Sequence, residues 1–413
     1  MRRVHTVRLL AIILIGGVLI GGALGLRNSR WAQERRLKKT DLPTLIALAS
    51  EQPRRPLVHF YLGTALFNAQ RFEEAAESFN RCLQLDPRFA RAYVGLGMCA
   101  MKRNRPDIAL NAFQQAIKED PRSAEARFML GTLYIDFLQS NSLALPELLK
   151  ATELDPKNDG AWYRLAECRS ALSQPNEAIE AAKRALQLKP NQPEYHRLLG
   201  QLYAFKGDFK TAEPYLKRAL QLNPSDPEAH YSMAKLYLSR SPRPQDLERA
   251  AREAQQAVAL APEMPPIHVI LAEVAVRQGK MDEAVQHLQR ALSLDPENDA
   301  ATFKLAEVYR RTGKMEQARQ LVEEFQRRSN LKRDIKNLID RIKHRPEDAS
   351  LRLRVARLLR EQGDLFRAAN QYQVCLSLQP NNEAAKKELE ALMKQVRAQQ
   401  KDKPSSQDKV APD

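Results

Sequence analysis

The residue types that most often ligate metals or act as nucleophiles are few in this sequence, which contains 7 histidines and 4 cysteines among 413 residues. The cysteines are Cys82, Cys99, Cys168 and Cys375. No two of them form a CxxC pair, the spacing that zinc sites and dithiol redox centres use. Each lies within a helical pattern, so the sequence favours buried free thiols over the alternative of disulfides or a metal site.

Four of the histidines occupy equivalent places in the helical pattern described below. They are His59, His196, His230 and His268. A helix separates each place from the next, and neighbouring helix axes lie about 8–10 Å apart, whereas a zinc–histidine bond is only about 2 Å long. These side chains therefore cannot share one ion. We expect them to have packing roles, and we expect no metal and no cofactor.

Motifs for catalysis or nucleotide binding do not occur in the sequence. It contains no GxSxG, no HExxH, no Walker-type glycine loop and no dinucleotide fingerprint. Pairs of Asp and Glu residues are no more frequent than on an ordinary helix surface, so they do not indicate a catalytic carboxylate pair. We therefore predict a protein that is not an enzyme and that has no catalytic residue.

The composition predicts an all-α protein. Hydrophobic residues make up 43% of the chain and charged residues 28%, while 15 glycines and 6% aromatic residues are few for a sheet-rich protein. The strong helix formers Ala, Leu, Gln, Glu and Arg make up the bulk. No segment alternates apolar and polar residues with the period of two that strands require.

One uninterrupted apolar run, Leu9 to Leu26, precedes the helical region. Its 18 residues would form a helix about 27 Å long, close to the ~30 Å hydrocarbon core of a bilayer. The run is longer than the ~7–15 residue core of a signal peptide, and basic residues follow it at once, so we predict one N-terminal transmembrane helix. The basic N-terminus and the small residues from Ala23 to Gly25 also fit the alternative, a cleavable signal peptide.

Basic residues flank the apolar run on both sides, three before it and six after it up to residue 40. Lys and Arg are enriched on the cytoplasmic side of membrane proteins. This asymmetry favours a single-pass membrane protein with a cytoplasmic main body. The alternative is a periplasmic or secreted protein after signal cleavage.

Ten prolines follow short helical runs at nearly constant intervals. They are Pro53, Pro87, Pro121, Pro156, Pro190, Pro224, Pro262, Pro296, Pro346 and Pro380. The steps between them are 34, 34, 35, 34, 34, 38, 34, 50 and 34 residues. A period of 34 residues is typical of a helix-pair repeat and not of a heptad.

Small residues recur in register with these prolines. A Leu-Gly or Leu-Ala pair stands at Leu62/Gly63, Leu96/Gly97, Leu130/Gly131, Leu165/Ala166, Leu199/Gly200, Leu271/Ala272 and Leu305/Ala306. Twelve residues before a proline, or in the same register, stand Ala75, Ala109, Ala144, Ala178, Ala212, Ala250, Ala284, Ala318 and Ala368. This pattern resembles the tetratricopeptide repeat family. The resemblance implies a right-handed superhelical solenoid of antiparallel helix pairs that binds partner proteins.

We assign about nine repeats, at residues 56–89, 90–123, 124–158, 159–192, 193–226, 227–264, 265–298, 299–330 and 349–382. The remaining segments are a basic N-terminus (1–8), the transmembrane helix (9–26), a basic juxtamembrane linker (27–40), a capping half-repeat (41–55), an extra basic helix (331–348), a capping helix (383–400) and a disordered tail (401–413). Repeats one to eight thus span 56–330. Residues 239–247 add four residues to repeat six, and we expect them to enlarge the loop between its two helices.

In the tetratricopeptide repeat family, defined positions of the first helix of each repeat, helix A, face a concave groove that holds a partner peptide or helix. In repeats one to four, these positions include Phe60, Phe67, Val94, Met98, Met101, Phe128, Ile135 and Tyr163. We name these eight residues the apolar strip. The alternative interpretation is that they pack inside the stack.

Residues 311–360 contain 15 Lys or Arg and 7 Asp or Glu, half of the chain's net charge of +16. Arg327, Arg328, Lys332 and Arg333 form what we name the basic patch. Such a cluster could bind nucleic acid or another acidic polymer, but a solvated helix face is the favoured interpretation and no recognition motif accompanies it. Nucleic-acid binding is therefore not expected.

The sequence as a whole favours a membrane-anchored, non-enzymatic scaffold that binds an unidentified protein partner through the apolar strip. In outline it also resembles bacterial membrane-anchored scaffolds of envelope assembly, although it lacks the C-terminal pair of CxxC motifs that one such class carries. The competing hypothesis is a secreted or periplasmic repeat protein that binds an acidic polymer through residues 311–360.

Overall fold

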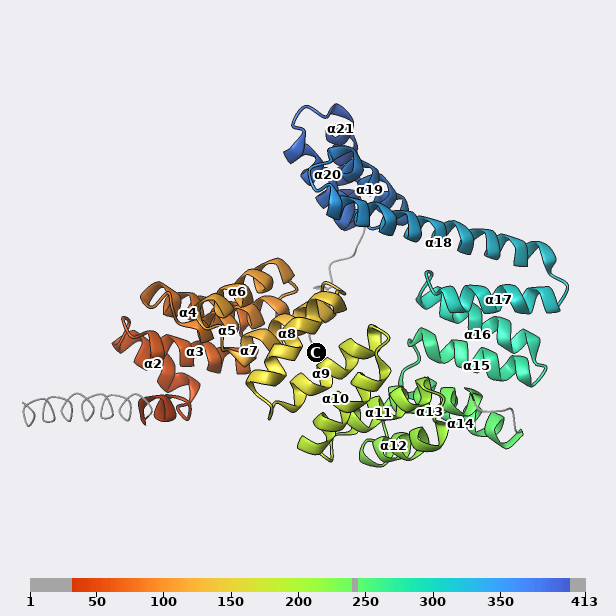
Figure 1. Ribbon diagram of the computed structural model, residues 1–413, viewed down its shortest axis with the longest axis horizontal. Helices are drawn as coiled ribbons and strands as arrows, with labels where there is room; N and C mark the ends of the chain where they lie inside the picture. The colour runs from red at the N-terminus through yellow and green to blue at the C-terminus, as the bar shows by residue number, and fades with distance from the viewer. Residues whose placement is uncertain (1–31, 240–243, 402–413) are drawn as a thin grey trace, which may run out of the picture. The chain divides into compact units, whose positions relative to one another are not determined.

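The chain folds into helices joined by short turns wherever its structure is described. The structure is a computed structural model, and it describes residues 32–239 and 244–401 (Figure 1). Within these ranges the chain contains no strand, which confirms the all-α prediction. The chain divides into two compact units, residues 1–236 and 237–413, with the boundary inside α13.

The first unit contains the capping half-repeat and the first five repeats. Its helices are α2 (Leu42–Glu51), α3 (Pro56–Asn68), α4 (Phe72–Leu85), α5 (Ala90–Lys102), α6 (Pro106–Glu119), α7 (Ala124–Asp136), α8 (Asn141–Leu154), α9 (Asp159–Ala171), α10 (Pro175–Leu188), α11 (Pro193–Phe205), α12 (Phe209–Leu222) and most of α13 (Pro227–Ser239). From α3 onward, each odd-numbered helix is a helix A, and the helix that follows it is its helix B. From α3 to α12 the two helices of each pair pack together, and α4, α6, α8 and α10 each also pack on the next helix A.

The second unit contains the remaining repeats and the C-terminal helix. Its helices after α13 are α14 (Pro244–Leu260), α15 (Pro265–Arg277), α16 (Met281–Leu294), α17 (Asp299–Arg311), α18 (Met315–His344), α19 (Ala349–Gln362), α20 (Leu365–Leu378) and α21 (Glu383–Lys401). Apart from α18, which runs past residue 330, each helix from α3 to α20 lies within one of the residue ranges assigned to a repeat. The helix α21 lies where the capping helix is expected.

Helix A and helix B of one repeat approach closely at a small residue. A side-chain carbon added to the glycine would lie 2.8 Å from Phe79 at Gly63, 2.4 Å from Phe113 at Gly97, 2.7 Å from Leu148 at Gly131 and 2.6 Å from Leu216 at Gly200. Carbon atoms in contact normally lie about 3.5–4.0 Å apart. The glycine of the Leu-Gly pair is therefore needed because a large helix B side chain lies directly against the helix A backbone.

The buried side chains form several hydrophobic cores within each unit. In the first unit, the cores run from α2 to α7 and from α8 to α11. All four cysteines of the chain are free and buried, as predicted. Burial raises the pKa of Cys82 and of Cys99 to about 12, so these two thiols stay protonated at neutral pH.

The helix α18 corrects the predicted boundary at residue 331. The sequence predicts a separate helix over 331–348, but residues 315–344 form one helix of 30 residues. Asn330 stands twelve residues after Ala318, where the other repeats have a proline. Proline stops a helix because it lacks an N–H and its ring clashes with the preceding turn. Without it, helix B of repeat eight runs on.

Repeat six also differs from the prediction. The helix α14 begins at Pro244 and has 17 residues, whereas α12 and the other ordinary B helices have 14. Most of the four-residue insertion therefore lengthens helix B and does not enlarge the loop. Residues 240–243 lie outside the described residues.

The segment before the first repeat is partly packed and is not a simple linker. Residues 32–37 are helical, and Leu37 is buried with 8% of its surface exposed, in the core that includes Leu45 and Tyr61. The predicted transmembrane helix, 9–26, lies outside the described residues. None of the helices in the described part of the chain has the length and apolar character needed to span a bilayer.

The turn between helix A and helix B holds one residue in the left-handed conformation. This residue is glycine in four repeats, at Gly207, Gly279, Gly313 and Gly363, with φ between 75° and 91°. In repeats one to four it is Gln70, Asn104, Gln139 and Ser173, with φ between 47° and 61°. A residue with a Cβ atom loses roughly 1–2 kcal/mol in this conformation. The first four repeats are therefore strained at this turn.

Replacing Ser173 by Gly should raise the free energy of unfolding by about 0.5–1 kcal/mol, measured by urea denaturation. The relief of left-handed strain, roughly 1–2 kcal/mol, exceeds the greater unfolded-state entropy of glycine, about 0.5–1 kcal/mol. The opposite kind of change, Gly207→Ala, should lower the free energy of unfolding by about 1 kcal/mol. An added carbon at Gly207 would have no atom within 4 Å, so a loss there would come from the backbone alone. Equal stability of all three proteins would contradict the strain argument.

Candidate interaction surfaces

The apolar strip lies on helix A of the first four repeats, α3, α5, α7 and α9. Seven of its side chains are partly buried, and Val94 is buried, with 2% exposed. Phe60 packs its ring 5.0 Å from the ring of Phe89, and the guanidinium of Arg91 lies 4.7 Å above it. The strip therefore contributes to packing between repeats, and all but Val94 keep some surface accessible.

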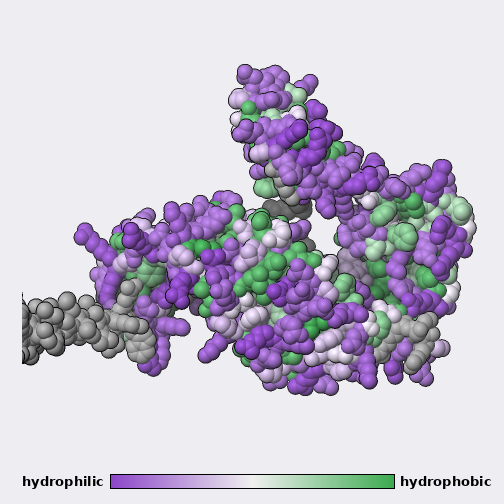
Figure 2. All heavy atoms as spheres, viewed as in Figure 1, coloured by the Kyte–Doolittle hydropathy of each residue, from purple (hydrophilic) through white to green (hydrophobic). Residues whose placement is uncertain are grey.

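The other aromatic members of the strip also pack within the helix layer. Phe67 lies 5.3 Å from Phe72, the first residue of α4, and Tyr163 stacks on Tyr195 of the next repeat at 5.1 Å. Figure 2 shows apolar side chains interspersed with polar ones over α8 and α9. The packing that the sequence offers as the alternative interpretation thus applies to these side chains, and it leaves part of their surface accessible.

The polar side chains beside the strip are paired across repeats. Arg164 of α9 donates to Glu167 at 2.8 Å and also to Asp136 of α7. Burial raises the pKa of Tyr163, and the neighbouring carboxylate of Glu167 adds to that rise. No short-range sequence pattern predicts the role of Arg164, because its partner Asp136 stands 28 residues earlier.

Two of the four basic patch residues take part in packing. Arg328 is half-buried and donates to the carbonyl oxygen of Pro296 at 2.5 Å and to the hydroxyl of Thr302 at 3.0 Å. Lys332 lies 3.6 Å from Glu297 and 3.6 Å from Asp299. The remaining two, Arg327 and Arg333, are exposed. The patch is therefore partly neutralised by its own fold.

The recurring histidines bind the proline turn that precedes their helix. The distance from the ring nitrogen to the proline carbonyl oxygen is 3.0 Å for His59 and Pro53, 2.8 Å for His196 and Pro190, 3.0 Å for His230 and Pro224, and 3.0 Å for His268 and Pro262. In repeat four, the indole N–H of Trp162 donates to the carbonyl oxygen of Pro156 at 3.0 Å. In the described part of the chain, no group of three or more His, Cys, Asp or Glu residues could hold a metal ion.

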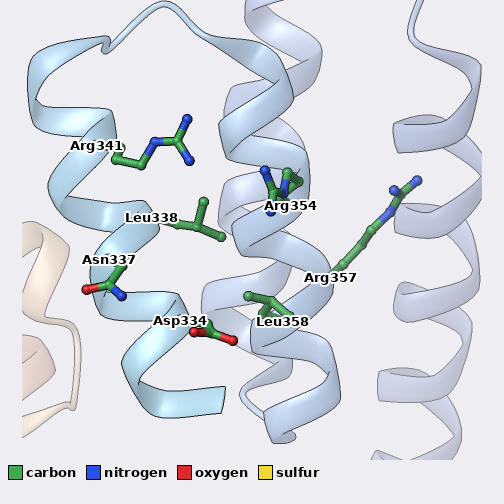
Figure 3. Close-up of a pocket in the computed structure, with 7 residues that line it drawn as sticks. All are labelled: Asp334, Asn337, Leu338, Arg341, Arg354, Arg357 and Leu358. Carbon is green, nitrogen blue, oxygen red and sulfur yellow. The ribbon is translucent and has the colours of Figure 1, made fainter. Parts of the chain in front are cut away.

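A cavity of about 540 Å³ lies between the C-terminal half of α18 and α19 (Figure 3). It is lined by Asp334, Asn337, Leu338, Arg341, Arg354, Arg357 and Leu358. In Figure 3, Leu338 points from α18 towards α19, and Arg357 points away to a neighbouring helix. There Arg357 donates to Glu388 at 2.7 Å. The sequence does not predict this site, because its pattern indicates an isolated helix over residues 331–348.

Family comparisons agree with the repeat pattern. A family model described as the cilia and flagella-associated protein 70 C-terminal domain, a tetratricopeptide repeat region, matches residues 47–264, just over half of the 413 residues. Two tetratricopeptide repeat models match residues 275–342 and 243–299. No curated protein matches the chain at a significant level.

Solved structures share the fold. The chain is similar to a monomeric mutant of IFIT1 bound to Gppp-AAAA, with a TM-score of 0.51 and 17% identity over 78% of this chain and 81% of that chain. It is also similar to PilF of Pseudomonas aeruginosa, with a TM-score of 0.47 and 20% identity over 53% and 97%. YrrB, a tetratricopeptide repeat protein with an unusual peptide-binding site, has a TM-score of 0.39 and 23% identity over 45% of this chain and 95% of that chain.

Replacing His196 by Ala should lower the free energy of unfolding by about 1–3 kcal/mol, because the partly buried carbonyl of Pro190 loses its donor. Urea denaturation measures the change. His344→Ala, at an exposed site of α18, serves as the matched control and should change stability by less than about 0.5 kcal/mol. Zinc or a chelator should leave both proteins unaffected; stabilisation by zinc that His196→Ala removes would contradict the packing role.

Proposed function

Since the chain belongs to the tetratricopeptide repeat family, we propose that it is a non-enzymatic scaffold that recruits partner proteins to a membrane. The partner binds across helix A of repeats one to four. The N-terminal apolar segment, Leu9 to Leu26, anchors the chain in the bilayer, with the repeats on the cytoplasmic side.

The observation that supports this proposal most is the apolar strip on consecutive A helices. Its side chains are partly buried, so they are already ordered and a partner that covers them loses little additional conformational entropy. Met98 and Met101 are flexible and polarizable, and such side chains adapt to varied apolar ligands. A peptide or helix that carries apolar anchors at regular spacing would fit this surface.

Anchoring is supported by the sequence of the first 40 residues. The apolar run has the length of a bilayer-spanning helix, and residues 1–40 carry nine Lys or Arg and one Glu. Basic residues next to a membrane gain roughly 1 kcal/mol each from anionic headgroups. These charges would hold the first repeat near the cytoplasmic surface.

Replacing both Met98 and Met101 by Gln should weaken capture of the partner by at least about tenfold. Glutamine preserves the length of methionine but replaces the polarizable thioether with an amide that must be desolvated, which costs roughly 1–3 kcal/mol per side chain. The measurement is quantitative mass spectrometry of proteins that copurify with the full-length chain from detergent-solubilised membranes.

The matched control replaces Leu143 and Leu149 by Gln. Both are exposed, at 52% and 40%, but they lie on helix B of repeat three. The control should keep the partner that the methionine variant loses. If the methionine variant retains every partner, or if both variants lose the same one, the helix A surface is not the binding site.

Labelling of one introduced cysteine can show on which side of the membrane the repeats lie. The four native cysteines are buried, so a membrane-impermeant maleimide should label only Ala384→Cys, at an exposed position of α21. We expect labelling after permeabilisation and none in intact cells. A variant without residues 9–26 should move to the soluble fraction. Labelling in intact cells would contradict a cytoplasmic location, and a membrane-bound deletion variant would contradict the anchor.

A further inference from the structure

The helix α18 contains a helix B whose helix A is absent. Its last residue, His344, stands five residues before α19 begins at Ala349, just as α4 ends at Leu85 five residues before α5 begins at Ala90. The second half of α18 and α19 therefore have the register of α4 and α5. Before α4 stands its helix A, α3, but the second half of α18 follows directly from the helix B of repeat eight.

The face of α18 that lines the cavity is the face that a helix A would cover. In α4, the buried residues are Ala75, Ser78, Phe79 and Cys82. At the equivalent positions, α18 has Asp334, Asn337, Leu338 and Arg341, and these four residues line the cavity. In the first repeat, Gly63 of α3 lies against Phe79. The cavity thus occupies the place of the missing helix A.

The facing side of α19 is also less covered than in the other repeats. Leu358 of the cavity is only partly buried. Its counterparts in repeats two, three and four are Cys99, Leu133 and Cys168, which are at most 1% exposed. Those residues have a preceding helix A beside them, whereas α19 follows α18 alone. Leu338, which is 5% exposed, and the partly buried Leu358 therefore form the apolar floor of the groove between α18 and α19.

The first repeat shows how such a place is filled by the chain itself. The helix α2 likewise precedes a helix A and begins the stack, and the helical residues 32–37 lie before it. Leu37 belongs to the same core as Leu45 of α2 and Tyr61 of α3. Tyr61 stands at the position that Arg354 has in α19. By analogy, we expect at least one turn of helix from another segment to cover the equivalent surface of α18 and α19.

The charges around the groove indicate what its cover would carry. The guanidinium groups of Arg341 and Arg354 have no hydrogen bond or ion pair with any residue that the structure describes. Arg357 is engaged by Glu388, and Asp334 has Arg333 at 3.9 Å. Two guanidinium groups therefore remain for carboxylates.

We propose that the groove between residues 334–341 of α18 and 354–358 of α19 binds an amphipathic, acidic helix of a partner protein. The helix takes the place of the missing helix A and pairs its carboxylates with Arg341 and Arg354. A glycine or alanine lies over Leu338, as Gly97 lies over Phe113 in repeat two. Helix A runs antiparallel to helix B, so the carboxylate near Arg341 stands in the first turn, where the helix dipole also favours negative charge.

The test is fluorescence anisotropy with the full-length chain in detergent micelles. The probe is an 18-residue amphipathic helical peptide with Leu, Ala and one central Gly on its apolar face and Glu beside that face in the first two turns, at the end of the groove where Arg341 and Arg354 lie. The peptide should bind saturably, and Arg341→Glu with Arg354→Glu should weaken binding by at least tenfold. A peptide with Arg in place of each Glu should bind that double variant and not the unaltered chain.

The matched control reverses two other exposed arginines of the same unit, Arg310→Glu and Arg327→Glu, and should keep affinity within about twofold. Circular dichroism checks that both variants fold, and Arg341→Ala with Arg354→Ala serves as a milder pair. Several results would overturn the proposal: no saturable binding by the unaltered chain, equal losses in both charge-reversed proteins, or failure of the charge-swapped peptide to bind.

Two further arms separate other occupants of the groove. Vesicles of phosphatidylserine and a single-stranded oligonucleotide test whether the same two arginines bind phosphate instead. Analytical ultracentrifugation tests whether a second copy of this chain fills the groove. Loss of vesicle binding, of oligonucleotide binding or of self-association in the Arg341/Arg354 variant, without peptide binding by the unaltered chain, would also overturn the proposal. The test is independent of the apolar strip on repeats one to four.

Discussion

The packing of each repeat depends on the close approach of two helices at a glycine or alanine. Where Gly97 meets the ring of Phe113, no room is left for even one more carbon atom. The large side chain of helix B fills the space that the small residue of helix A leaves open, and each helix pair still has apolar faces on both sides. Those faces can be buried only against the next pair, so the array grows by stacking and its ends need a cover.

Most of the fold could be predicted because its signals are local and repeat. Proline and the small-residue pairs identify helix ends and crossings in most repeats, and there the helix pairs lie where those signals place them. Two errors within the repeats occur where a local signal is missing or misleading. Asn330 replaces a proline, so α18 continues, and Pro244 begins α14 within a stretch that resembles a loop. Neither outcome depends on a pattern that repeats.

Much less of the interaction surfaces could be predicted, because their properties depend on residues far apart in the chain. The position of Phe60 in the helix predicts a groove, but its burial comes from Phe89, at the end of the same repeat, and from Arg91 of the next repeat. Arg328 belongs to a run of basic residues, yet it donates to the carbonyl of Pro296, 32 residues earlier. A charge count treats such an arginine as free for a ligand, although the fold already uses it.

The same reasoning explains why α18 can tolerate the loss of its helix A. If its uncovered face kept the Ala, Ser, Phe and Cys of α4, it would expose an apolar surface that favours aggregation. The face instead carries Asp334, Asn337 and Arg341 around one leucine, and these polar side chains remain hydrated when nothing covers them. A partner helix must displace that water, so apolar contact with Leu338 alone would gain little. Carboxylates that meet both arginines would offset the desolvation, and charge therefore decides which helix binds.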